Sequence, residues 1–313
     1  MAFPKLSTSR VDTINTKVLQ AYTNDEFVAD KVLPVLSVTE ESGKLAGIGN
    51  EHLRVYTSKR SLNDEGQHRM EFTYTNDDSY AIDYYDLEIY AAQRLQDQVQ
   101  SPFDVRRDAG IVLRQALMLE REMALATALA STSIMTNNVT LSGTSQWNDF
   151  NNSDPAANIE TARDSVQSRT GKEANSAIFP RSVLNKLKYH PLITNYYKGI
   201  ATISGSMVIA AIKDLFEIEN VYVPKPIYIS SKEGQTETKA SVWGKNVVLF
   251  YKPSAPSLFQ PSFGYQIKLQ GQDLRLSYRR SENDTGDMIK LETAYQDKIL
   301  DTNCGYLIKS VIA

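Results

Sequence analysis

The sequence predicts an elongated α+β protein, and three observations lead to this fold class. One very long helical pattern occupies residues 101–130, a polar and aromatic excursion precedes it at residues 43–90, and short strands alternate with short helices after it. Alternating strands and helices favour one compact sheet covered by helices, whereas a helix longer than a small domain is wide favours an extended body. No internal repeat is visible in the 313 residues.

Residues 1–30 are predicted to form an N-terminal arm. This segment is rich in Ser, Thr and Asn, and its one amphipathic stretch, residues 11–22, has apolar side chains at helical spacing. The apolar run at residues 32–36 is interrupted by Pro34, which favours an extended edge segment over a central strand. Because the arm buries little surface of its own, we expect it to lie against the subunit body or a neighbour.

The polar excursion is predicted to be a long two-stranded hairpin. Residues 54–57 and 69–75 have the pattern of strands, because Val55, Phe72 and Tyr74 alternate with polar residues, and a turn signal lies between them at residues 63–66. An isolated hairpin is marginally stable in water, so this one needs a partner surface. The pattern leaves two alternatives open: contact with another subunit, or folding back onto its own chain.

The long helix is predicted to begin with Ser101 as its N-cap and Pro102 at its first helical position. At 1.5 Å per residue it would be roughly 43 Å long and would act as a beam across the subunit. No second helix of comparable length is available as a coiled-coil partner. The predicted buried stripe consists of Val112, Ala116, Leu119, Met123, Ala126 and Ala130, flanked by Leu113, Leu117 and Leu125.

The second half of the chain is predicted to mix helices and strands. Asp154 and Pro155 begin a helix that Gly171 ends. Further helices are expected at residues 180–189 and 206–216. Strands are expected at residues 176–179, 221–223, 227–229, 242–243, 246–251, 265–269, 274–279, 288–300 and 306–312.

Composition excludes several classes of protein. The formal net charge is -3, from 34 Lys and Arg against 37 Asp and Glu, which argues against a general nucleic-acid binder. The single Cys304 cannot form an intrachain disulfide, and the three scattered histidines do not suggest zinc. The longest apolar run, residues 207–212, is far shorter than the roughly 20 residues that span a bilayer. We expect folding in a reducing cytosol.

Motifs for catalysis are weak. Gly47 and Gly49 lack the third glycine of a dinucleotide fingerprint and favour a loop. Asp86 and Glu88 share one strand face, but without a visible partner strand a solvated face is the preferred interpretation. Cys304 has no accompanying histidine or acid motif, so a small apolar role is favoured over a nucleophile. No catalytic, cofactor-binding or metal-binding residue is assigned.

Seven segments, in order along nearly the whole chain, resemble the major capsid proteins of tailed bacteriophages with the HK97-type fold. None is diagnostic alone, but seven in register are hard to explain by chance. They are residues 27–38 (FVADKVLPVLSV), 43–56 (GKLAGIGNEHLRVY), 142–155 (SGTSQWNDFNNSDP), 170–172 (TGK) with Asn175, 242–251 (VWGKNVVLFY), 261–265 (PSFGY) and 304–313 (CGYLIKSVIA).

The resemblance implies a division of the chain into four parts. The N-terminal arm would be residues 1–36, and the extended E-loop hairpin residues 37–85. The peripheral domain, with its long spine helix and elongated sheet, would take residues 86–150 and 263–300. The compact α/β axial domain would take residues 151–262 and 301–313.

The resemblance also implies a structural function: self-assembly as pentamers and hexamers into an icosahedral shell around phage double-stranded DNA. DNA would be contacted weakly and without sequence specificity, which suits the near-neutral charge. Lys59, Arg60 and Arg69 of the E-loop become candidates for pairing with acidic residues of the adjacent subunit, at most about 1 kcal/mol each.

Partners and location follow from the same resemblance. A separate scaffolding protein is expected because the arm of residues 1–36 is too short to contain a scaffolding domain, and a portal is expected as well. We expect the protein in the virion capsid, assembled in the host cytoplasm and without a membrane partner. Two alternatives remain open: an encapsulin-like cellular shell protein, which would hold cargo in place of DNA, and an α/β enzyme, which would be a monomer or small oligomer.

Overall fold

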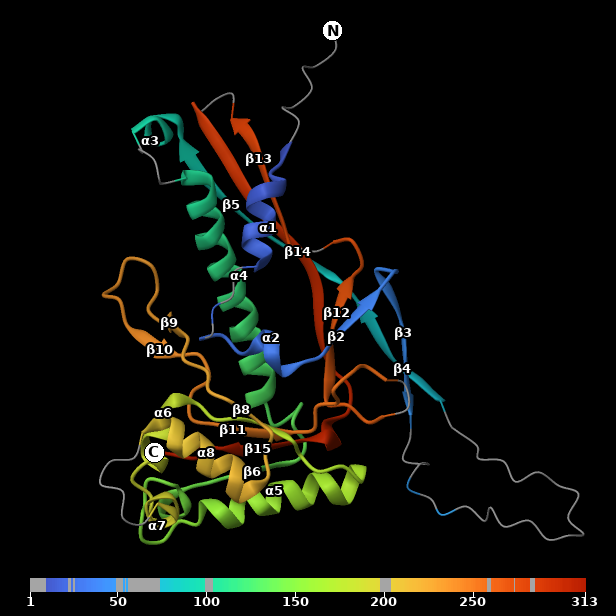
Figure 1. The fold of residues 1–313 in the computed structure, drawn as a ribbon, viewed down its shortest axis with the longest axis vertical. Coiled ribbons are helices and arrows are strands. Elements are labelled where there is room, and N and C mark those ends of the chain that lie inside the picture. The colour runs from blue at the N-terminus through green and yellow to red at the C-terminus, as the bar shows by residue number, and fades with distance from the viewer. Residues whose placement is uncertain are drawn as a thin grey trace, which may run out of the picture.

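The computed structural model describes residues 10–21, 24, 26–48, 53, 55, 74–98, 104–197, 204–257, 260–272, 274–281 and 285–313. The molecule is elongated, with a long helix and a narrow sheet along its length and a compact α/β region at one end (Figure 1). The predicted α+β class and elongated shape are confirmed.

The elongated sheet is organised around one long strand. Strand β14 (Gly286–Ile299) pairs along one edge with β5 (Asp83–Ala92), and along the other edge first with β13 (Arg275–Ser281) and then with β12 (Gly264–Leu269). These pairings are antiparallel. Together they extend along the whole of β14, so the sheet is long and narrow. β1 (Arg10–Val11) extends it beside β13, and β2 (Val35–Val38) lies parallel to β12 as the edge strand that Pro34 predicted.

The spine helix α4 (Val105–Ala130) packs on one face of this sheet, mainly against β5 and β14 (Figure 1). Its 26 residues correspond to about 39 Å. It begins later than predicted: Asp104 is the N-cap and accepts hydrogen bonds from the amides of Arg106 and Arg107 at 2.9 and 3.2 Å. The proposed cap at Ser101 and Pro102 lies outside the described residues.

The predicted buried stripe of α4 was wrong by about one residue, or 100° around the helix axis. Of its central members only Ala126 is buried, and Val112 is 54% exposed, whereas the flanking Leu113, Leu117 and Leu125 are all buried. The buried face instead carries two charged residues that a search for apolar periodicity passes over. Its members are Gly110, Leu113, Leu117, Arg121, Glu122, Leu125, Ala126 and Leu129.

The compact region is a five-stranded sheet in the order β6-β15-β11-β7-β8, with helices around it. The strands are β6 (Asn138–Thr140), β7 (Ser176–Ile178), β8 (Asn220–Tyr222), β11 (Val247–Phe250) and β15 (Gly305–Lys309), and the helices are α5 (Pro155–Thr170), α6 (Arg181–Leu187), α7 (Pro191–Tyr196) and α8 (Gly205–Phe216). Asp154 caps α5 and Gly171 ends it at φ 66°, both as predicted. Helix α7 was not predicted, and residues 242–243 are not a strand.

Smaller elements complete the described fold. The arm contributes α1 (Thr13–Ala21) and α2 (Ala29–Val32), and α3 (Gln93–Gln98) follows β5. β3 (Ser42–Ile48) and β4 (Tyr74–Ala81) form an antiparallel pair at the base of the predicted hairpin, whereas the expected strand at residues 54–57 lies almost wholly outside the described residues. β9 (Ile227–Ile229) and β10 (Lys239–Ser241) form a second hairpin, and η2 (Gly143–Ser145) and η3 (Thr302–Cys304) are short 3₁₀ turns.

Four groups of buried apolar side chains follow this architecture. The largest fills the compact region around Trp147 and Phe179, and a second, around Phe250 and Phe263, joins that region to α2 and the end of α4. A third lies between α1, α4 and the elongated sheet, and the fourth lies under β3 and β4. Among the described residues, no helix is long and apolar enough to cross a bilayer, and no group of acidic, His and Cys residues could hold a metal ion.

The two α4 faces can be distinguished by a matched pair of truncations. Leu113→Ala removes a side chain that is 4% exposed and should lower the free energy of unfolding by about 2–5 kcal/mol. Val112→Ala should change it by about 0.5 kcal/mol or less, because Val112 is exposed. Urea unfolding monitored by circular dichroism measures both, and equal losses would contradict the assigned face.

Candidate functional site: a buried polar junction

Two charged neighbours, Arg121 and Glu122, lie on the buried face of α4 where the arm, the elongated sheet and the compact region meet. Arg121 is 7% exposed and Glu122 is fully buried. A buried charge is costly unless it is paired and hydrogen-bonded, so their partners decide whether the fold can tolerate them. The two side chains use different sets of partners.

Glu122 connects the arm to the compact region. Its carboxylate accepts hydrogen bonds from the backbone amides of Val28 at 3.1 Å and Ala29 at 2.8 Å, which are the free amides at the start of α2. It also accepts a hydrogen bond from Trp243 Nε1, in the segment between β10 and β11. A side chain of α4 therefore caps a helix of the arm, because the N-cap residue Val28 has no polar side chain.

Arg121 connects the arm to the elongated sheet. Its Nε and Nη2 donate to the two carboxylate oxygens of Asp297 on β14 at 2.7 and 3.0 Å, a bidentate geometry. Its Nη1 pairs with Asp30 of α2, and Nη2 also reaches the carbonyl oxygen of Ala29 at 3.3 Å. The guanidinium lies 5.1 Å from the ring centre of Tyr295. Ala29 is thus held by both charges, and Asp30 by Arg121 alone.

Burial acts on the two charges differently. Burial raises the pKa of the Glu122 carboxyl, and the hydrogen bonds from Trp243, Ala29 and Val28 only partly offset that shift. Burial opposes the charge of Arg121, but the carboxylates of Asp297 and Asp30 more than compensate, so its pKa is raised. Arg121 is therefore firmly charged, and Glu122 is stabilised as an anion only while its donors are in place.

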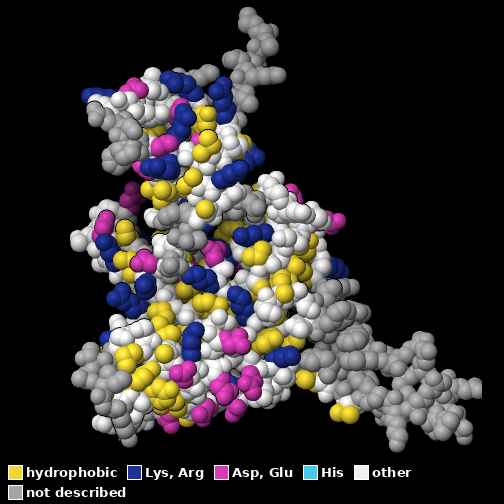
Figure 2. Space-filling view, viewed as in Figure 1, with side chains coloured by type: hydrophobic (Ala, Val, Ile, Leu, Met, Phe, Trp, Pro, Cys, Tyr) yellow, Lys and Arg dark blue, Asp and Glu magenta, His cyan; other side chains and the backbone are white. Residues whose placement is uncertain are grey.

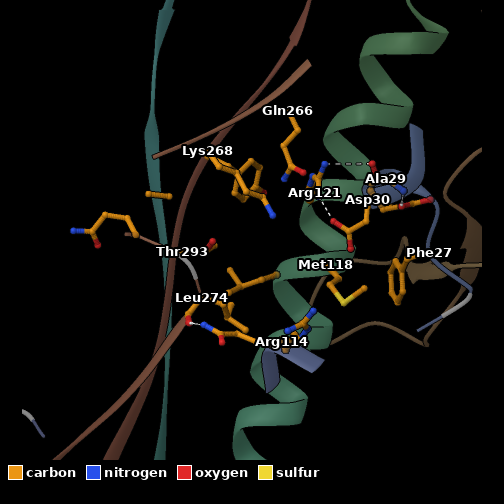
Figure 3. A pocket seen from close by; sticks show the side chains of 16 residues that line it. Phe27, Ala29, Asp30, Arg114, Met118, Arg121, Gln266, Lys268, Leu274 and Thr293 are labelled. Atoms are coloured by element: carbon orange, nitrogen blue, oxygen red, sulfur yellow. Dashed lines mark hydrogen bonds and ion pairs between the residues drawn. The ribbon is translucent and has the colours of Figure 1, made fainter. Parts of the chain in front are cut away.

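A cavity of about 350 Å³ lies beside this junction, between α4 and the elongated sheet (Figure 3). Arg114 and Met118 reach it from α4, and Lys268 and Thr293 reach it from the sheet. Its lining residues, as far as the structure describes them, contain no Ser, Cys or His that could act as a nucleophile or general base. The junction joins elements of the fold.

The sequence-predicted contact residues Lys59, Arg60 and Arg69 lie outside the described residues, so their roles stay predictions. The base of their hairpin is described. β3 and β4 cover the end of the elongated sheet, where Ala81 donates to the side chain of Gln296 at 3.1 Å.

The two strand carboxylates Asp86 and Glu88 have cross-strand partners that the sequence did not reveal. Asp86 pairs with Lys290 of β14 at 3.1 Å, and Glu88 pairs with Arg279 of β13 at 3.3 Å. Glu292 extends this ladder with Lys290 at 3.3 Å and Arg275 at 3.0 Å. These carboxylates form ion pairs on an open sheet face, and Asp86 is 52% exposed, as expected for a solvated face.

Two other titratable groups are buried in the compact region and its edge. Burial raises the pKa of the Cys304 thiol, which is fully buried beside Asp301 and fits the predicted apolar role. His190 is 4% exposed, and its Nδ1 accepts the amide hydrogen of Leu192 at the start of α7, while Nε2 lies 3.2 Å from Ser153 Oγ. Burial lowers the pKa of His190.

The sequence contained one signal for the junction that was missed. Leu113, Leu117, Leu125 and Leu129 recur at multiples of four residues, and Arg121 occupies the missing position in that series. A charge at a position where the helix repeat requires an apolar residue indicates either that the buried stripe is interrupted there or that the charge is buried with an oppositely charged partner. Its partners, Asp297 and the arm, lie too far away in sequence to be identified from the pattern.

The chain is similar in sequence to two curated phage proteins, although no family model matches it. The major capsid protein of Burkholderia phage BcepMu is 27% identical over 308 residues, which cover 96% of each chain. The major capsid protein of Pseudomonas phage JBD67 is 26% identical over 252 residues, or 77% of each chain.

Solved structures share the fold. A phage-related protein from Bordetella bronchiseptica RB50 aligns with a TM-score of 0.76 at 24% identity, over 97% of this chain and 98% of its own. The capsid protein of cyanophage P-SCSP1u aligns with a TM-score of 0.57 at 12% identity, over 99% of this chain and 91% of its own. The SrpI encapsulin of Synechococcus elongatus PCC 7942 aligns with a TM-score of 0.50 at 9% identity, over 96% of each chain.

An elongated subunit with a spine helix, a narrow sheet and a compact α/β end defines the class of proteins with the HK97-type fold. Within this class, the sequence relatives are phage major capsid proteins, so the resemblance to the tailed-phage major capsid proteins is confirmed. The encapsulin alternative is less supported, because this chain shares only its fold with the SrpI encapsulin, at 9% identity.

Removing the Glu122 carboxylate should destabilise the subunit strongly. Glu122→Ala leaves three donors without an acceptor, and each buried unsatisfied donor costs about 1–3 kcal/mol. Trp243→Phe removes one donor and should cost about 1 kcal/mol. Glu120→Ala, on the exposed side of α4, is the matched control and should change the stability by about 0.5 kcal/mol or less. Thermal and urea unfolding would refute the role of Glu122 if the Ala variants at 120 and 122 behaved alike.

The cap on α7 should make stability depend on pH. A lowered His190 pKa means that the native state binds this proton more weakly than the unfolded state, whose pKa is about 6.5. The stabilising contribution is therefore complete above about pH 6.5 and is lost as the pH falls through the lowered pKa. His190→Asn can still cap α7 but cannot titrate. Its urea midpoint should fall less between pH 7 and 5 than that of the wild type, and parallel profiles would contradict the prediction.

Proposed function

We propose that this protein is a structural subunit, the phage major capsid protein, and that copies of it assemble as pentamers and hexamers into an icosahedral shell around double-stranded DNA. The observation that carries the proposal is a relationship to a phage major capsid protein over 96% of both chains, together with an architecture shared with a solved phage capsid. The junction fits this role because it holds the parts of an elongated subunit in one arrangement.

We propose the division into arm, E-loop, peripheral domain and axial domain with one change. β6 pairs with β15, and Trp147 belongs to the largest apolar cluster of the compact region. Residues 131–150 therefore join the axial domain, which lies at the compact end of the molecule (Figure 1). The peripheral domain keeps α4 and the elongated sheet.

The proposed function includes partners beyond the subunit itself. A separate scaffolding protein and a portal would act during assembly in the host cytoplasm, and the protein would then reside in the virion capsid. Packaged DNA would be contacted weakly, which suits a net charge of -3. Catalysis is not part of the proposal, since the sequence relatives are structural proteins.

The test is negative-stain electron microscopy with size-exclusion chromatography of the purified protein at low and moderate salt. We expect rings of five or six subunits or closed shells, and we expect Lys59→Glu with Arg60→Glu and Arg69→Glu to reduce their yield without changing the unfolding temperature. Shells that co-purify with a cargo enzyme would favour the encapsulin alternative. A protein that stays monomeric at high concentration, even with scaffolding protein added, would overturn the proposal.

A further inference from the structure

The β9–β10 hairpin, residues 227–241, projects from the subunit on the side of α4 opposite to β3 and β4 (Figure 1). Its two strands pair only with each other among the described strands. Ile227 and Ile229 lie on one face of β9 and are 57% and 54% exposed. A two-stranded hairpin with such a face is marginal in water by itself and gains stability from a covering surface.

The base of this hairpin is held firmly. The amide of Lys225 donates to the carbonyl oxygen of Glu26 at 3.2 Å, and the amide of Val242 donates to the carbonyl oxygen of Pro226 at 3.2 Å. Trp243, two residues after β10, is the donor to Glu122 in the junction. The isoleucine face is therefore presented in a fixed position by the same contacts that hold the arm.

Lysines accompany the two isoleucines. Lys239 lies directly across from Ile229 in the antiparallel register and is exposed, and the exposed Lys225 precedes β9. The two acidic residues of the hairpin, Glu233 and Glu237, lie in the connecting loop beyond the strands. Figure 2 shows Lys, Arg, Asp and Glu side chains among hydrophobic ones on this side of the molecule. The strand face is thus apolar with a positive border.

The opposite side of the subunit carries a complementary surface, which we call the acidic patch: Glu40, Glu41 and Tyr84, with Asp86 beside Tyr84 in its ion pair with Lys290. All four side chains are exposed, and the Tyr84 hydroxyl donates to Glu41 at 2.6 Å. Tyr84 and Asp86 share one face of β5, and Tyr84 is 56% exposed. An aromatic ring surrounded by carboxylates can receive apolar side chains and a lysine together.

We propose that the β9–β10 hairpin of one subunit docks on the acidic patch of a second copy of this chain. Ile227 and Ile229 pack against Tyr84, and Lys239 faces Glu40 and Glu41. The two surfaces lie on opposite sides of one subunit, so the contact is head-to-tail, and it closes a ring where the rotation between neighbouring subunits divides a full turn. This inference rests on the proposed function and specifies one of its subunit contacts.

Cysteine cross-linking tests the contact directly. The double variant Ile229→Cys with Glu41→Cys, oxidised after assembly, should give a ladder of covalent oligomers up to five or six chains on a non-reducing gel. The native Cys304 is fully buried and does not contribute. Each single-cysteine variant is the matched control and should remain monomeric on the gel. Dimers from Ile229→Cys alone would show hairpin-to-hairpin contact and overturn the head-to-tail arrangement.

Charge reversal provides the second readout. Lys239→Glu should lower the assembled fraction about tenfold, because like charges then face each other across the contact. Adding Glu41→Lys in the same chain should restore most of it, and the unfolding temperatures should match the wild type because both side chains are exposed. Lys232→Glu, in the connecting loop, is the control and should assemble normally.

The outcomes separate the inference from the proposed function. If the wild type forms rings or shells but the double-cysteine variant gives no ladder and Lys239→Glu assembles normally, the docking contact is wrong and the capsid function stands. If the wild type forms no assembly with or without scaffolding protein, both are overturned. A ladder together with rescue by the paired charge reversal supports the contact.

Discussion

The structure depends on one buried pair of adjacent charges in the middle of its longest helix. Arg121 and Glu122 together contact the arm, the elongated sheet and the segment that precedes β11, so three regions distant in sequence converge on two residues of α4. Buried ion pairs contribute little net stability compared with apolar packing, but losing one partner is expensive. The pair thus makes a single arrangement of the regions much more favourable than any arrangement that leaves a donor or a charge unsatisfied.

This constraint explains how the arm is attached to the body of the subunit at α2. α2 is only four residues long and has no polar side chain of its own to cap it. The free amides of α2 donate hydrogen bonds to Glu122, and Asp30 pairs with Arg121. Val28, Val32 and Leu33 add apolar contacts with the core.

The two faces of the elongated sheet serve different purposes. One is covered by α4 and α1 and is apolar around Leu113, Leu276 and Leu291. The other is divided: β3 and β4 cover the part near β12, and the ladder of Asp86, Lys290 and Glu292 occupies the rest. A charged ladder keeps an open sheet face solvated.

The sequence by itself determined most of the local structure. Caps such as Asp154, the glycine that ends α5, the strand periodicity of residues 288–300 and the edge position implied by Pro34 all depend on neighbours in the chain, and the structure agrees with them. The resemblance of segments along the chain also identified the fold class.

What the tertiary structure decided is which face of α4 is buried, because Arg121 and Glu122 become acceptable core residues only when Asp297, Asp30, Trp243 and the amides of α2 are brought to them. The same holds for Asp86 and Glu88, whose partners lie about 200 residues away on β13 and β14. Long-range polar complementarity has no sequence period, so it becomes visible only after the chain has folded.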